Sequence, residues 1–129
     1  MNCWGDNAFG QLNTNDAVDK LIPTATINWT RGITKIEIGS SFACAAAHDG
    51  HLECVGSNAQ GQIGIGSTSG VNACAASTNN CYYTPQSVLA FEKADGLFVE
   101  HFDLGLRNAC AVAFDAGKQN TYVRCWGEN

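Results

Sequence analysis

The sequence predicts an all-β fold built from about two copies of a four-stranded antiparallel unit. A pentapeptide of the form Cys-x-Gly-x-Asn occurs three times, as CWGDN from Cys3, CVGSN from Cys54 and CWGEN from Cys125. Between these boxes, short apolar or alternating runs recur in the same order, separated by Gly, Asn and Asp, as in strands joined by turns. No segment carries a sustained apolar stripe at helical spacing. Four short strands in each unit of roughly 50 residues are typical of a β-propeller blade.

The expected strands follow the chain from the first box to the last. They cover residues 2–4, 22–27, 33–38, 42–47, 51–55, 86–91, 97–103, 109–115 and 122–126. The alternation is clearest in the third of these, where Ile36 and Ile38 flank Glu37. The second unit is longer than the first mainly because of a polar stretch at residues 67–83, which we expect to be an inserted loop.

The repeats resemble those of the regulator of chromosome condensation family, which includes the α-tubulin suppressor-like proteins. The resemblance lies in VRCWGEN, in GQIGIGS, and in the longer run IEIGSSFACAAAHDGHLECVGSNAQGQIG. The sequence departs from the family pattern at Val55, where Trp is usual, and at Asn13, where Gly is usual. The resemblance implies an incomplete propeller.

Transferred to this chain, the blade boundaries of the family imply one partial propeller domain over residues 1–129. A half blade spans residues 1–31, a complete blade with the inserted loop spans 32–91, and an incomplete blade spans 92–129. Since the chain starts beside one box and ends inside another, we expect it to be a fragment of a longer repeat protein.

The hairpin between Cys44 and Cys54 predicts a disulfide. A three-residue loop with Gly50 at the left-handed position places the two cysteines opposite each other, at a Cα separation that a disulfide spans. The alternative is zinc, because His48 and His51 lie in the same hairpin and complete a two-sulfur, two-nitrogen set. The equivalent hairpin of the next repeat has cysteines but no histidine, so we expect no metal site and no cofactor.

Two further cysteine pairs are expected. Cys110 and Cys125 face each other if the segment between them turns over four residues, and Cys74 and Cys81 close a loop of their own. Cys3 remains unpaired. Disulfides form in oxidising compartments, so we expect a secreted or cell-surface protein. The alternative is a reduced, cytoplasmic protein in which the cysteines are small core residues.

Composition excludes several function classes. The chain has 7 Lys and Arg against 12 Asp and Glu, for a net charge of -5, and no basic run. Nucleic acid is therefore not an expected partner, because binding it requires clustered cations. No apolar run approaches the roughly 20 residues that span a bilayer. No set of residues suggests a catalytic site, so we expect no enzyme activity.

The family resemblance implies a non-catalytic protein-protein interaction module. We expect contact through the inserted loop, with Tyr82 and Tyr83 as aromatic anchors and Trp29 as a second exposed contact. One alternative, also implied by the resemblance, is a guanine nucleotide exchange factor or chromatin-associated regulator. Another is a carbohydrate-binding surface protein that uses Trp29. Open strand edges are further expected to pair with missing propeller repeats or with a second copy of the chain.

Overall fold

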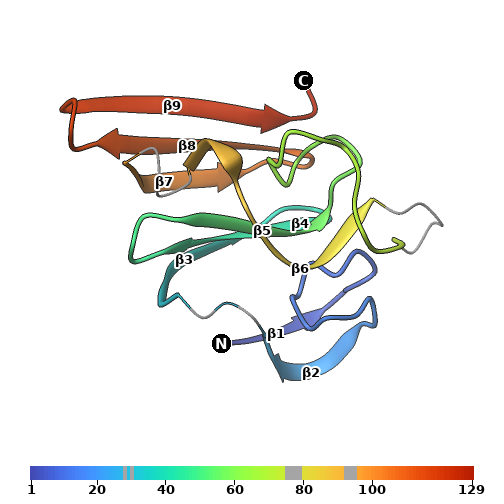
Figure 1. Ribbon diagram of the computed structural model, residues 1–129. Helices are drawn as coiled ribbons and strands as arrows, with labels where there is room; N and C mark the ends of the chain where they lie inside the picture. The colour runs from blue at the N-terminus through green and yellow to red at the C-terminus, as the bar shows by residue number, and fades with distance from the viewer. Residues whose placement is uncertain (28, 30, 75–79, 92–95) are drawn as a thin grey trace.

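Three antiparallel sheets are stacked one above another in the computed structural model, which describes residues 1–27, 29, 31–74, 80–91 and 96–129 (Figure 1). The first sheet contains β1 (Asn2–Gly5) and β2 (Lys20–Ala25). The second contains β3 (Ile33–Ile38), β4 (Phe42–Ala47), β5 (Leu52–Ser57) and β6 (Cys81–Ser87). The third contains β7 (Leu97–Leu104), β8 (Asn108–Asp115) and β9 (Asn120–Gly127). Neighbours in each sheet are consecutive in sequence, as in an all-β propeller blade.

The expected strands match the observed ones within a few residues, except for the sixth. The strand expected at residues 86–91 instead begins at Cys81, and a short 3-10 helix, η1 (Leu89–Phe91), follows it. The inserted loop is correspondingly shorter than expected, because Cys81 and Tyr82 pair with β5. Pro85 is tolerated because β6 is an edge strand whose register with β5 is interrupted there.

Both cysteine-bearing hairpins turn where the sequence predicts. His48, Asp49 and Gly50 form the tip of the β4–β5 hairpin, and Gly50 has a φ of 86°. In the β8–β9 hairpin, Asp115 pairs with Asn120, which leaves four residues in the turn. The turns set the register of each hairpin, and this register places the cysteines of each pair opposite each other.

The buried core lies mainly between the second and third sheets. Phe42, Cys44 and Ala46 alternate along β4 and belong to one buried cluster with Phe102 and Ala111 of the third sheet. The intervening residues of β4 are buried too, so both faces of this strand are covered. Small alanine and cysteine side chains allow the sheets to approach closely. In the described part of the chain, no helix has the length and apolar character needed to cross a bilayer.

The β8–β9 turn is expected to make stability depend on pH. Burial alone raises the pKa of the Asp115 carboxyl, but hydrogen bonds from the Lys118 and Gly117 backbone N–H groups and the Lys118 ammonium outweigh this effect. The net pKa is therefore lowered. A lowered folded-state pKa contributes stability above the unfolded value of about 4 and loses it as pH falls through the folded value.

We therefore expect the free energy of unfolding to fall more steeply below about pH 4 in the wild-type chain than in an Asp115→Asn variant. Urea unfolding at neutral pH and at about pH 3 measures this difference. Equal losses in the two proteins would show that Asp115 contributes no pH dependence.

Candidate protein-interaction site

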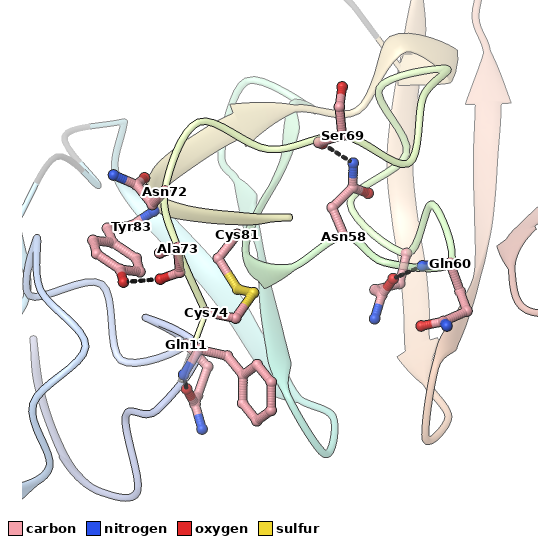
Figure 2. The surroundings of a disulfide bond; sticks show 11 residues. Gln11, Asn58, Gln60, Ser69, Asn72, Ala73, Cys74, Cys81 and Tyr83 are labelled. Carbon is pink, nitrogen blue, oxygen red and sulfur yellow. Dashed lines mark hydrogen bonds between the residues drawn. A yellow bond between two sulfur atoms is a disulfide. The ribbon is translucent and has the colours of Figure 1, made fainter. Parts of the chain in front are cut away.

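A buried asparagine organises the loop that follows each of the first two boxes. The Asn58 side chain is fully buried, and its Oδ1 accepts from the Ile63 N–H at 3.1 Å. Its Nδ2 donates to the Ser67 carbonyl at 2.9 Å. The same Nδ2 also donates to the Ser69 carbonyl at 2.6 Å (Figure 2). Asn7 has the same role in the first repeat, where its Oδ1 accepts from the Leu12 N–H at 2.9 Å. The box asparagine thus fixes the start of the inserted loop.

The end of the inserted loop is fixed by a disulfide and a short β-bridge. Cys74 is bonded to Cys81, and Asn72 forms an isolated antiparallel bridge with Cys81 (Figure 2). The Asn72 Oδ1 accepts from the Tyr83 N–H at 3.1 Å, and the Tyr83 hydroxyl donates to the Ala73 carbonyl. Residues 75–79 lie outside the described part of the chain. The described part of this loop is therefore held at both ends.

Tyr82 and Tyr83 have different environments. Only 9% of Tyr82 is exposed, and its side chain belongs to the core cluster, which does not fit the expected role of an exposed anchor. Tyr83 is half-buried and points the other way, since neighbours in a strand face opposite sides. Its ring lies so close to Gly10 that a Cβ at Gly10 would overlap it. Tyr83 therefore joins the second sheet to the loop of the first repeat.

Trp29 lies apart from the inserted loop. Its side chain is half-buried in a cleft between the first and second sheets, lined also by Thr26 and Ile33. The indole Nε1 is buried and has no hydrogen-bond partner among the described residues. The structure thus does not bring the three predicted contact residues together on one surface.

Val71 is the exposed apolar residue of the loop that sequence reasoning missed. It is 72% exposed, and its neighbours from Ser67 to Ser69 and Ala73 are exposed as well. The sequence could have indicated this residue, because Val71 is the single large aliphatic residue in the run of small and polar residues between Ser67 and Asn80. An exposed valine on a loop held at both ends offers an apolar contact point for another protein.

The structure pairs six cysteines as disulfides. The bonds join Cys44 to Cys54, Cys74 to Cys81, and Cys110 to Cys125. The first and third link residues directly opposite in their hairpins, with Cα atoms 4.1 Å apart in each. Because Cys44 and Cys54 are bonded to each other, they are unavailable to the zinc site considered as an alternative. In the described residues, no group of three or more His, Cys, Asp or Glu side chains is placed to hold a metal ion.

Cys3 is the free cysteine of the described residues. It lies in β1 opposite Thr24 and is partly buried. Burial raises the pKa of its thiol, although the positive N-terminus opposes this effect. The thiol is therefore predominantly protonated at neutral pH and is a weak nucleophile.

Comparisons with known proteins point to one fold. No protein-family model and no curated protein matches the sequence. Among solved structures, one similar protein is Prp20p from Saccharomyces cerevisiae, whose structure is described together with its binding to Gsp1p and histones. Its sequence is 16% identical and its TM-score is 0.67, and the match covers 93% of this chain and 28% of Prp20p. Yeast RCC1 (Prp20) bound to Kap60 is 18% identical with a TM-score of 0.64, over 90% of this chain and 28% of that one.

Human WBSCR16 is 17% identical with a TM-score of 0.63, over 97% of this chain and 29% of that one. This chain thus spans less than a third of the length of each of these structures. At these identities the likeness concerns the fold, and it agrees with the repeat pattern and the three stacked sheets. The expected fold class is confirmed: the chain has the fold of part of an RCC1-type β-propeller.

Proposed function

We propose that this chain is a non-catalytic protein-protein interaction module from a secreted or cell-surface propeller protein. The observation that carries this proposal is the inserted loop, which presents exposed Val71 while Asn58 holds one end and the Cys74–Cys81 disulfide holds the other. A loop ordered before binding loses less conformational freedom when its partner arrives.

Two further observations support the proposal. The fold neighbours include proteins described with protein partners, namely Gsp1p, histones and Kap60. The three disulfides favour an oxidising compartment for the protein, because cytosolic reductants keep most thiols reduced. The neighbours support protein binding, and the disulfides support an extracellular location for it.

A peptide-display selection against the oxidised 129-residue chain tests the loop as the contact surface. We expect selected peptides to bind at least tenfold more weakly to a Val71→Asp variant, because a carboxylate replaces the apolar contact. Binding should fall similarly in a Cys74→Ser/Cys81→Ser variant, whose loop is no longer closed. The matched control is Val18→Asp, a change at an exposed valine in the loop of the first repeat. If the control weakens binding and Val71→Asp does not, the loop assignment fails.

The exchange-factor alternative rests on the fold neighbours, one of which is described as binding Gsp1p. Release of a labelled guanine nucleotide from a small GTPase in the presence of this chain measures that activity directly. We expect release at the rate of the GTPase alone. Faster nucleotide release in the presence of the oxidised chain would show that the protein is an exchange factor and would contradict the proposed function. The carbohydrate alternative is less favoured, since the Trp29 indole N–H is buried instead of facing solvent.

A further inference from the structure

The inserted loop covers part of the outer edge of β6. β6 is the last strand of the second sheet, and β5 pairs with its other edge. The sheets stack on one another's faces, so a neighbouring sheet covers a face of the second sheet and leaves this edge free (Figure 1). The contacts at this edge are therefore a feature of the second repeat itself.

Residues 70–73, here called the strap, run along the first part of this edge. The Cys81 N–H donates to the Asn72 carbonyl at 3.1 Å. The Cys81 carbonyl accepts from the N–H groups of Val71 at 3.2 Å and Asn72 at 2.9 Å. Further along β6, the Tyr83 N–H donates to the Asn72 Oδ1 at 3.1 Å. The strap therefore acts as a short additional strand beside β6 and protects backbone groups that an open edge would expose.

Gly70 allows the strap to lie directly on β6. A Cβ at this position would lie 2.4 Å from the Cys81 nitrogen and 2.5 Å from the Asn80 carbonyl carbon. Both are backbone atoms, which cannot turn aside as the end of a flexible side chain can. Glycine is therefore the residue that fits here without moving the strap away from the strand.

Two further contacts fasten the far end of the strap. The Tyr83 hydroxyl donates to the Ala73 carbonyl, and Cys74, which follows the strap, is bonded to Cys81. Each hydrogen bond of the strap contributes little net stability, and ordering the strap costs conformational entropy of similar size. The covalent bond therefore decides whether the strap stays on β6.

A thiol reductant can reach this bond from solvent. Cys81 is fully buried, but Cys74 is only partly buried. A thiolate of a dithiol reductant attacks the Cys74 sulfur, which breaks the bond and releases the Cys81 thiolate. The second thiol of the reductant then displaces Cys74. Two electrons and two protons pass to the protein, which gains two thiols, while the dithiol becomes a disulfide; oxidation reverses the step.

We propose that the Cys74–Cys81 disulfide is a redox-controlled latch on the strap, and that a dithiol reductant switches off the Val71 contact surface by opening it. With the latch closed, the Val71 N–H is bonded to the Cys81 carbonyl and the valine keeps one position. With the latch open, the strap leaves β6, and a partner must order it again on binding. The inference rests on the proposed interaction function and deepens it by naming how the contact surface is regulated.

A Cys110→Ser/Cys125→Ser variant isolates the latch for the test. It removes the most exposed disulfide, and Cys44 and Cys54 are fully buried, so mild dithiothreitol should open the latch alone. Alkylation followed by mass spectrometry verifies which cysteines are reduced. Circular dichroism that matches the wild-type spectrum verifies that the variant folds.

Hydrogen exchange of this variant reports whether the strap opens. We expect the amides of Asn72 and Tyr83 to exchange at least tenfold faster after reduction, measured by NMR, and to recover after reoxidation. The amides between β4 and β5 should exchange at an unchanged rate, because the latch does not touch that pairing. Unchanged exchange of Asn72 and Tyr83 after verified reduction would overturn the latch.

Gly70→Ala in the wild-type chain lifts the strap without removing the latch. Its Cβ meets the backbone of β6, so the Asn72 and Tyr83 amides should exchange at least tenfold faster while mass spectrometry shows the disulfide intact. Gly117→Ala is the matched control, because a Cβ there lies 3.4 Å from the Asp115 Oδ1, an ordinary contact. Equal exchange in the two alanine variants would show that the strap does not rest on β6 in solution.

Peptides selected against the oxidised chain link the latch to the contact surface. They should bind the reduced Cys110→Ser/Cys125→Ser variant at least tenfold more weakly than its oxidised form, and reoxidation should restore binding. Faster amide exchange with undiminished peptide binding would overturn the regulation. Selection that yields no Val71-dependent peptide would contradict the proposed function, whereas the exchange rates would still decide whether the latch holds the strap.

Discussion

Replacing Asn58 with alanine should lower the free energy of unfolding by roughly 2–4 kcal/mol. The side chain is fully buried, and the substitution removes one bond to a backbone N–H and two bonds to backbone carbonyls. The Ile63 N–H is buried and would lose its partner without access to water. Because Ser67 and Ser69 are exposed, their carbonyls recover bonds to solvent and keep the loss within this range.

Asn129 provides the matched control, since it holds the same box position but is exposed. An Asn129→Ala variant should differ from wild type by no more than about 0.5 kcal/mol. Urea unfolding followed by tryptophan fluorescence measures both. If the two alanine variants were equally stable, the hydrogen bonds of Asn58 would not be what organises the loop.

Removing the Cys44–Cys54 disulfide should also lower the free energy of unfolding substantially. A Cys44→Ala/Cys54→Ala variant should lose roughly 2–4 kcal/mol of stability. Ten positions separate these residues, so the disulfide removes a moderate amount of conformational entropy from the unfolded chain. Both cysteines are also fully buried in the core, so the smaller alanine side chains remove packed atoms. Thermal unfolding of the oxidised variant beside wild type measures the loss.

The Cys110–Cys125 disulfide of the third sheet should be more accessible to a reductant than the Cys44–Cys54 disulfide. Cys110 and Cys125 are exposed, while Cys44 and Cys54 are covered by the third sheet. Under a mild thiol reductant we therefore expect Cys110–Cys125 to open first and Cys44–Cys54 last. Alkylation at timed intervals, followed by mass spectrometry, reports this order. Reduction of Cys44–Cys54 before Cys110–Cys125 would mean that the second and third sheets separate readily in solution.

The features predicted from sequence are those set by near neighbours in the chain. Gly50 at the hairpin tip determines which residues of β4 and β5 face each other, so Cys44 and Cys54 were placed opposite each other without coordinates. Asn13 stands where the repeat usually has glycine, and it adopts a φ of 55°. Asparagine tolerates this left-handed conformation, which explains why the departure leaves the loop intact.

The inserted loop was predicted less well because its structure depends on distant partners. Its polar composition places residues 67–83 in one loop, but Cys81 and Tyr82 form strand β6 through pairing with Ser57 and Gly56. Nothing in the local sequence reports that pairing. The same pairing turns Tyr82 into the core, which a composition rule that treats tyrosine as a surface anchor cannot anticipate.

The sequence alone determined the repeat unit, the antiparallel hairpins and the opposition of the cysteines, because alternation and turn chemistry act over a few residues. Which of the equivalent residues are buried depends on contacts between the sheets. Trp4 and Trp126 hold the same box position, yet Trp4 is 61% exposed, whereas Trp126 packs on Phe91 and donates to Gln62. Burial depends on whether another sheet lies alongside, and no local pattern encodes that contact.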